Sequence, residues 1–186
     1  MNNISFKSRI KAVSLSEFAR ATSSYKNNCV AYPWTMKESL FKPSAYTTDV
    51  YDCTVCGFSD GANVLLMHIC PTIAKNLKFD KIEEFIKEKL DLTNPNLQGF
   101  LLGSRDGFND STNSPKVFKF FESFMNRNNI SYSKMRNSNS EVNVAYSSIT
   151  DEWVIASKDY NADKSSKENL SKYFDDIKLS ELDEFA

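Results

Sequence analysis

The segment Thr47–Pro71 reads TTDVYDCTVCGFSDGANVLLMHICP. Its first half, Thr48–Gly57, is rich in β-branched and aromatic residues, and its second half, Asn63–Cys70, is a short apolar run without room for a helix. Between them, Ser59–Gly61 has the sequence Ser-Asp-Gly, which is a turn signal. We therefore predict two strands joined by a hairpin, with the beginning of the first strand near the end of the second.

This hairpin brings a cysteine close to the chain's only histidine. Cys53 lies in the first predicted strand, and His68 follows it by fifteen residues in the second. A thiol is a weak nucleophile until it loses its proton, and an imidazole within hydrogen-bond reach can take that proton. The pair Cys53 and His68 is therefore a candidate for a thiol nucleophile and its base.

The composition indicates one domain, residues 1–186. A hydrophobic content of 41%, with fourteen Phe and eight Tyr, is ample for a single core. Four cysteines, three of them between Cys53 and Cys70, do not form the framework of a small disulfide-rich secreted domain. Reduced thiols in a cytosol fit this pattern better.

The charge and hydropathy patterns exclude two classes of partner. Basic and acidic residues nearly cancel, 23 against 24, and no basic stripe interleaves with aromatics, so nucleic acid is not an expected partner. No apolar stretch approaches the length of a membrane span or the apolar part of a signal peptide. We therefore expect a cytoplasmic protein without a membrane partner or, for the product of a phage or pathogen, one that acts in a host cytosol.

The remaining sequence alternates helix and strand signals. Ser14–Glu17 has the form of a capping box, and Ser114-Pro115 is a strong helix start. The predicted elements are a helix over Leu15–Ala21, a helix from Asp80 ended by Asn94-Pro95, a strand over Leu97–Leu102, a helix burying Val117, Phe118, Phe121, Phe124 and Met125, a strand over Ile130–Met135, and a hairpin of Val142–Ile149 with Trp153–Ser157. The last segment, Lys158–Ala186, carries eight acids and five lysines and is predicted as an amphipathic tail helix.

The order of these features resembles one enzyme family. Thr47 and Cys53-x-Val-Cys are followed by a turn, His68-x-x-Pro71, a helix, an apolar strand ending at Gly103-Ser104, an aromatic helix and a final strand pair with an acidic turn. This order resembles the chemoreceptor glutamine deamidase family, CheD, and the related cytotoxic necrotizing factor catalytic domain. The resemblance covers residues 44–157 and implies an α/β (α+β) fold with a layered β-sheet core, a β-sandwich, flanked by helices. Residues 1–43 are then an N-terminal extension and residues 158–186 an acidic tail.

The resemblance also implies a reaction. In that family a cysteine attacks the side-chain carboxamide of a protein glutamine, a histidine serves as base, and in CheD a threonine six positions before the cysteine orients the histidine. Thr47 occupies that position relative to Cys53. The implied catalytic residues are Cys53, His68 and Thr47, the implied partner is a protein substrate, and no metal or organic cofactor is required. A hydroxyl or carbonyl at Thr47 can hold the imidazole by accepting from the nitrogen that faces away from sulfur.

Other roles for the cysteines stay open at this point. Cys53, Cys56, His68 and Cys70 supply four ligands of the kind that zinc binds. Cys53 and Cys56 face opposite sides of a strand, which argues against this site, whereas His68 and Cys70 share a face. Cys29, Cys56 and Cys70 are otherwise simplest as small core residues.

Two hypotheses from different classes follow. In the first, the chain is a cysteine-dependent protein-glutamine deamidase. In the second, the fold has lost catalysis and acts as a protein-binding module, with Lys158–Ala186 as the docking element. The Thr47, Cys53 and His68 set favours the first hypothesis. Asp52, directly before Cys53, favours the second, because a neighbouring carboxylate raises the pKa of a thiol.

Overall fold

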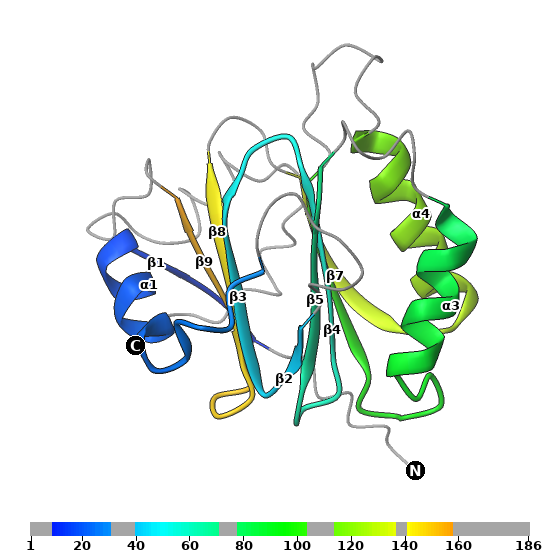
Figure 1. The fold of residues 1–186 in the computed structure, drawn as a ribbon, viewed down its shortest axis with the longest axis horizontal. Coiled ribbons are helices and arrows are strands. Elements are labelled where there is room, and N and C mark those ends of the chain that lie inside the picture. The colour runs from blue at the N-terminus through cyan, green and yellow to red at the C-terminus, as the bar shows by residue number, and fades with distance from the viewer. Residues whose placement is uncertain (1–8, 31–39, 71–77, 104–113, 137–140, 158–186) are drawn as a thin grey trace.

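The computed structural model describes residues 9–30, 40–70, 78–103, 114–136 and 141–157. Within these residues two β-sheets face each other, and helices cover their outer sides (Figure 1). The chain is therefore a mixed α+β protein with layered sheets, which confirms the predicted fold class. The segment Lys158–Ala186, predicted as an amphipathic tail helix, lies outside the described residues.

The first sheet, called sheet A below, has four strands in the order β1-β9-β8-β3. The strands β8 and β9 form the predicted hairpin, and β3 pairs with β8 in antiparallel fashion. The strand β1 has no counterpart among the predictions, and it joins the sheet by parallel pairing with β9. The bounds are Arg9–Val13 for β1, Ser44–Val50 for β3, Val142–Ser147 for β8 and Glu152–Ser157 for β9.

The second sheet, called sheet B below, has five strands in the order β2-β5-β4-β6-β7. The strands β4 and β5 form the predicted hairpin, whose loop is closed by Asp60 accepting from the amides of Ala62 and Asn63. The strand β6 connects through a helix to β7, its parallel neighbour. The bounds are Leu40–Lys42 for β2, Thr54–Ser59 for β4, Val64–Ile69 for β5, Gln98–Gly103 for β6 and Ser131–Arg136 for β7.

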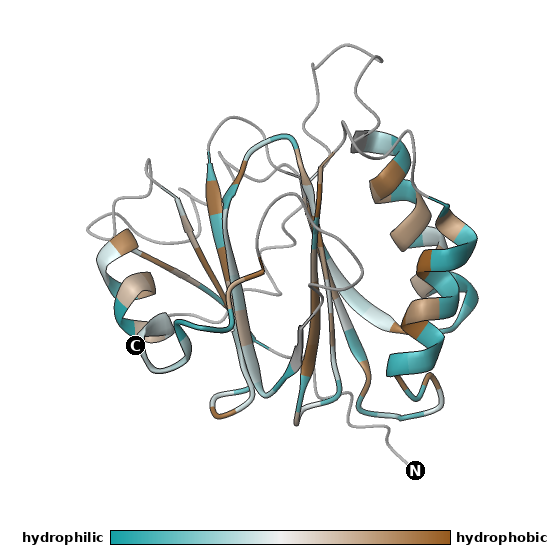
Figure 2. Ribbon diagram, viewed as in Figure 1, coloured by the Kyte–Doolittle hydropathy of each residue, from teal (hydrophilic) through white to brown (hydrophobic). Residues whose placement is uncertain are grey.

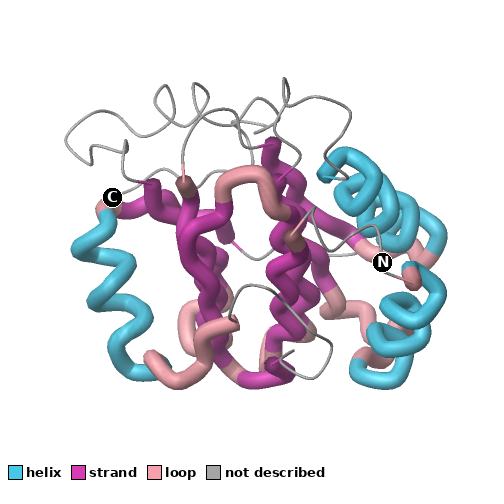
Figure 3. The backbone as a smooth tube through the Cα atoms, turned by 45° about the horizontal axis from the view of Figure 1, so that its top comes forward, coloured by secondary structure: helices cyan, strands magenta, loops and turns pink. Residues whose placement is uncertain are grey.

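The helices cover the outer side of each sheet, as Figure 3 shows from a second direction. On sheet A, α1 spans Leu15–Thr22 and begins with the predicted capping box, and the 3-10 turn η1 follows at Ser23–Tyr25. On sheet B lie α3, Phe79–Lys89, and α4, Ser114–Arg127. The prediction that α3 continues to Asn94-Pro95 is wrong, because the chain becomes extended at Leu90.

One predicted strand is divided between the two sheets. The apolar segment Thr48–Gly57 contains the end of β3, a bend at residues 51–53 and the start of β4. The strand β3 carries a bulge between Thr47 and Val50, where Asp49 has a φ of 59°. A bulge bends a strand and increases its twist, which helps the chain to leave sheet A here and enter sheet B. Cys53 therefore lies in the connection between sheets rather than within a strand.

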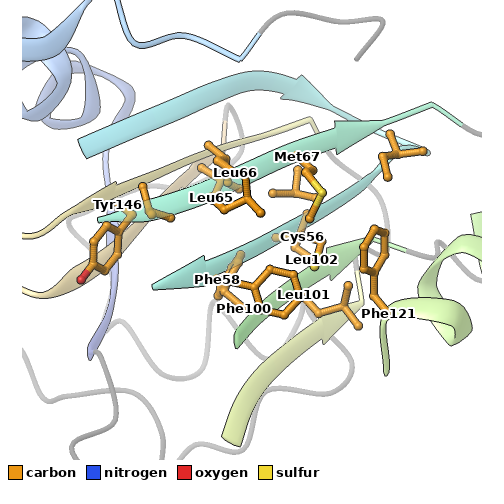
Figure 4. Packing of buried hydrophobic residues seen from close by; sticks show 14 of the residues in the cluster. Cys56, Phe58, Leu65, Leu66, Met67, Phe100, Leu101, Leu102, Phe121 and Tyr146 are labelled. Atoms are coloured by element: carbon orange, nitrogen blue, oxygen red, sulfur yellow. The ribbon is translucent and has the colours of Figure 1, made fainter. Parts of the chain in front are cut away.

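The core has a layer between the sheets and a layer beneath the helices. Figure 2 shows hydrophobic residues along the strands and hydrophilic ones over much of α3. Between the sheets, the rings of Phe100 and Trp153 stack with centroids 4.6 Å apart. On the helix side, Phe58 meets Phe124 of α4 edge to face. Figure 4 shows the apolar residues that pack around the central strands of sheet B, among them Cys56, Leu65, Met67, Leu101 and Phe121.

The contact between the sheets depends on a glycine. A Cβ on Gly57 would lie 2.1 Å from the Trp153 ring, so this position accepts no side chain without moving the ring. We expect Gly57→Ala to lower the free energy of unfolding by about 1–3 kcal/mol or more, since overpacking a core forces neighbours from their positions. Urea unfolding measures the change. Gly61→Ala is the control: nothing lies within 4 Å of its added Cβ, so only its positive φ of 87° contributes a cost.

Candidate active site

The imidazole of His68 lies between the two sheets. In the register of sheet B, His68 is opposite Val55, and its side chain faces sheet A. There it meets Thr47 of β3, whose Oγ1 is 2.7 Å from Nδ1 of His68. Both residues are buried, with exposed fractions of 1% for His68 and 0% for Thr47. The hydrogen bond expected between them is therefore present.

A second hydrogen bond of Thr47 determines which histidine nitrogen carries the proton. The Thr47 hydroxyl donates its only proton to the carbonyl of Val30 at 2.9 Å. Toward His68 the hydroxyl oxygen can then only accept, so Nδ1 of His68 is the donor. In the neutral ring this leaves the lone pair on Nε2, which is buried. The arrangement Val30–Thr47–His68 thus prepares Nε2 as a proton acceptor.

Cys53 lies on the same face of sheet B as His68. It stands one residue before β4, and continuing the β4–β5 register places it opposite Cys70 and diagonal to His68. Side chains in diagonal positions of an antiparallel pair have Cα atoms about 7–8 Å apart, within reach of long side chains. In the structure the Cys53 Sγ points toward Asp52 Oδ1 at 3.9 Å. The thiol thus lies on the same face of sheet B as the imidazole, and its weak hydrogen bond is directed to the carboxylate.

The local environment favours the neutral forms of both groups. Burial raises the pKa of Cys53 far above its usual value, and the neighbouring Cys70 and Asp52 raise it further. Burial lowers the pKa of His68 from 6.5 to about 4, and the charges of Asp49 and Asp52 oppose that shift. At neutral pH the resting site therefore holds a thiol and a neutral imidazole. Proton transfer between them requires a change in solvation, such as the arrival of a substrate.

Asp52 acts on the two groups in opposite senses for catalysis. Its charge disfavours the thiolate of Cys53 and favours the imidazolium of His68. In a thiolate–imidazolium pair, the repulsion between Asp52 and the thiolate is offset in part by its attraction to the imidazolium. The carboxylate therefore suppresses the free thiolate more strongly than it suppresses the ion pair.

We expect Asp52→Asn to make the Cys53 thiol more reactive. Removing the charge lowers the pKa of Cys53, so the alkylation rate with iodoacetamide at about pH 8 should rise by roughly threefold or more. Mass spectrometry of the Cys53 peptide measures the rate, and Asp80→Asn in the first turn of α3 is the matched control. An unchanged or slower rate in Asp52→Asn would contradict the assigned role of the carboxylate.

Gly103 supports the backbone at Cys53 from the neighbouring strand. A Cβ on Gly103 would lie 2.6 Å from the carbonyl oxygen of Cys53 and 2.9 Å from Cα of Thr54, and its φ of 144° is one that side chains rarely adopt. Close approach of this kind is a common reason for glycine in a strand. The glycine at the end of the apolar strand, noted in the resemblance, thus positions β6 against the candidate nucleophile.

Three participating residues were not predicted from the sequence. Val30 contributes a carbonyl, and no sequence signal marks it. Asp49 contributes charge from a bulge, and a non-glycine residue with positive φ is also not readable from the sequence. Cys70, expected as a core residue, is buried but adjoins Cys53. The hairpin register, which follows from the loop at residues 60–63, could have revealed this pairing.

The other cysteines have separate surroundings. Cys56 is buried on the helix side of sheet B, as expected for a core residue. Cys29 is exposed, so its assignment to the core is wrong: it forms an isolated bridge with Tyr46 at the edge of sheet A. Among the described residues, no three of the His, Cys, Asp and Glu side chains are grouped to hold a metal ion.

A surface groove lies apart from this site. A hollow of about 560 Å³ lies between α1 and the outer face of sheet A, with Lys11, Arg20, Tyr25 and Glu152 in its lining. We place the candidate active site between the sheets and not in this groove. A histidine with a defined hydrogen bond on the same face as a thiol indicates a particular chemistry, whereas a hollow surface does not. Cys53 itself is 4% exposed, so a substrate must displace neighbouring atoms to reach it.

No protein-family model and no curated protein matches this chain. In the part of the chain that the structure describes, no helix has both the length and the apolar character needed to cross a bilayer.

Proposed function

We propose that the chain is a cysteine-dependent protein-glutamine deamidase of the CheD type. The observation that carries this proposal is the pair of hydrogen bonds from Thr47, which leaves the lone pair of His68 on Nε2. A lone pair on Nε2 is what a general base for the Cys53 thiol requires. The expected partner is a protein substrate in a cytosol, and the resemblance over residues 44–157 supplies the reaction class.

The first half of the reaction forms a thioester. Nε2 of His68 takes the proton of Cys53 as Sγ attacks the carboxamide carbon of a substrate glutamine. The tetrahedral oxyanion requires fixed donors, and in this proposal the backbone amide of Cys53 is one of them. The imidazolium then gives its proton to the departing ammonia. Thr47 keeps the ring oriented throughout, because its oxygen continues to accept from Nδ1–H.

The second half hydrolyses the thioester. His68 removes a proton from water, the hydroxide attacks the thioester carbon, and the Cys53 thiol leaves, so the product side chain is glutamate. Bringing the substrate carboxamide to Cys53 also displaces water from the site. Removal of this water strengthens the attraction between thiolate and imidazolium. That ion pair is disfavoured in the free site.

Mass spectrometry of candidate substrates tests the proposal. The protein is incubated with a cell lysate or with purified signalling proteins, and glutamines converted to glutamate are identified by their gain in mass. We expect conversions at specific glutamines that are lost with Cys53→Ser, while Cys29→Ser, which alters an exposed cysteine that takes no part in the proposed reaction, retains them. Equal conversion by the wild type and Cys53→Ser would sink the proposal.

A second candidate function is protein binding without catalysis. The observation that favours it is the resting chemistry of the site, where burial, Cys70 and Asp52 all raise the pKa of Cys53. A binding module would show iodoacetamide reactivity at Cys53 no greater than that of an unfolded-peptide thiol, in the presence of its partner as well as alone. A deamidase would show increased reactivity when the substrate is bound.

A further inference from the structure

The strands β4 and β5 bring two cysteines opposite each other at one end of their ladder. The ladder pairs Val55 with His68 and ends with Thr54 and Ile69, and continuing this register by one residue places Cys53 opposite Cys70. Directly paired residues of antiparallel strands point to the same face of the sheet. Both thiols therefore lie on the face toward sheet A.

The two sulfur atoms are close neighbours. Burial is the main reason that the pKa of Cys53 is raised, and the next contribution is the charge of Cys70, together with a side-chain hydrogen bond between the two thiols. Thiols exert such effects only at short range. In the structure both residues are reduced, with exposed fractions of 4% for Cys53 and 3% for Cys70.

The backbone geometry already suits a bond between them. Directly opposed residues in antiparallel strands have Cα atoms about 4.5–5.5 Å apart, depending on whether the pair is hydrogen-bonded. A disulfide spans Cα separations of about 4.4–6.8 Å. Because Cys53 and Cys70 each lie one residue beyond the β4–β5 ladder, a bond between them would need little movement of the backbone besides a rotation of the side chains.

The other two cysteines cannot compete for this bond within one molecule. Cys56 is on the opposite face of β4, where it is paired with Met67 and covered by the helix layer. Cys29 is exposed at the edge of sheet A, beside Tyr46. The pairing of Cys53 with Cys70 is thus specific among the four cysteines of the chain.

We propose that Cys53 and Cys70 form a reversible intramolecular disulfide, a modification site that blocks the candidate nucleophile. With hydrogen peroxide as oxidant, Cys53 passes its proton to Nε2 of His68 as its sulfur attacks one oxygen. The O–O bond breaks, Cys53 becomes a sulfenic acid, and the leaving hydroxide takes the proton back from the imidazolium to form water. The Cys70 thiol then attacks the Cys53 sulfur, forming the S–S bond and releasing water. In total the two thiols lose two electrons and two protons, and peroxide is reduced to two waters.

The consequence for activity rests on the proposed function. A sulfur bonded to Cys70 cannot attack a carboxamide, so oxidation would switch the deamidase off and a dithiol reductant would restore it. Cys70 also protects the site, because it converts the sulfenic acid to a disulfide before further oxidation to the irreversible sulfinic acid.

Peptide mapping of the full chain tests the disulfide without any assay of activity. The reduced protein is treated with hydrogen peroxide, free thiols are blocked with iodoacetamide, and chymotrypsin, which cuts after Phe58, separates the Cys53 peptide from the Cys70 peptide. We expect these two peptides to be linked, with fragmentation assigning the bond to Cys53, and we expect dithiothreitol to separate them. Cys29→Ser should give the same link, and Cys70→Ser should give a Cys53 sulfinic acid instead.

Each outcome of the experiment decides one proposal. The disulfide proposal would be overturned by a link through Cys56 or Cys29. It would also be overturned by complete alkylation of Cys53 and Cys70 after oxidation. Neither result affects the deamidase proposal. A Cys53–Cys70 link in a protein that deamidates nothing would sustain the disulfide and remove its regulatory meaning. If both proposals hold, oxidation lowers deamidation at least tenfold and dithiothreitol reverses the loss, except in Cys70→Ser, where the loss persists.

Discussion

Replacing Thr47 by valine should lower the deamidation rate by about 10²- to 10³-fold, the scale on which acid–base catalysis and ring orientation act. Valine has nearly the same shape as threonine but cannot accept the Nδ1–H of His68. The ring is then free to carry its proton on Nε2, where it cannot receive the proton of Cys53. The loss should appear in kcat, with KM little changed, because Thr47 is buried between the sheets and does not contact substrate.

Two further variants separate orientation from general destabilisation. Thr47→Ser keeps the hydroxyl and should retain most of the activity. Thr93→Val removes an exposed hydroxyl that donates to Asp91 in the loop after α3, and should leave the rate unchanged. Thr47→Val also leaves the Val30 carbonyl and the His68 N–H without this partner, at a cost of about 1–3 kcal/mol. Thermal unfolding therefore accompanies each assay, and a folded Thr47→Val protein with full activity would exclude Thr47 as an orienting residue.

A spectroscopic measurement reads the same hydrogen bond directly. Because His68 is the only histidine, nitrogen-15 labelling of histidine gives signals from one ring. We expect the proton on Nδ1 in the wild type and in Thr47→Ser, and a shift of the proton toward Nε2 in Thr47→Val. A wild-type ring protonated on Nε2 would contradict the assignment whether or not the protein is an enzyme.

The sequence predicts much of the fold because local signals agree with the final packing. Two helices begin where local signals predict, at the capping box Ser14–Glu17 and at Ser114-Pro115. The β4–β5 hairpin likewise has its turn at the predicted Ser59–Gly61. The division of Thr48–Gly57 between two sheets was not predictable, because its β-branched and aromatic residues suit either arrangement. A bulge at Asp49 decides it, and the φ of 59° at that residue depends on tertiary contacts such as the one between its amide and Asn143.

The candidate site shows the same limit. The spacing of Cys53 and His68 and the choice of Thr47 could be read from the sequence, since they depend on one hairpin and a resemblance. The carbonyl of Val30 could not, because Thr47 reaches it through a contact seventeen residues distant that no periodicity encodes. The position of Asp52 before Cys53 is visible in the sequence, but the size of its effect on the two pKa values is not. Its effect on Cys53 and on His68 depends on the bend in which it lies, where the chain passes from sheet A to sheet B.

The buried histidine should also make folding stability depend on pH. The pKa of His68 is about 4 in the folded state and 6.5 in the unfolded chain, so the unfolded state binds the proton more readily between these values. Stability is therefore full above the unfolded pKa and falls as pH falls toward the folded one. From about pH 7 to pH 5 the expected loss is roughly 2 kcal/mol, in a range where ordinary carboxylates remain largely ionised.

Urea unfolding at several pH values measures this loss, and His68→Gln is the control that isolates it. Glutamine does not titrate, so the variant should be nearly insensitive to pH between about 7 and 5, whatever its absolute stability. The difference between the two proteins isolates the titration of His68, because the chain has no other histidine. Equal slopes in the two proteins would mean that His68 is readily protonated in the folded state. A base that accepts the Cys53 proton only when substrate has entered requires the opposite, a ring kept neutral by burial between the sheets.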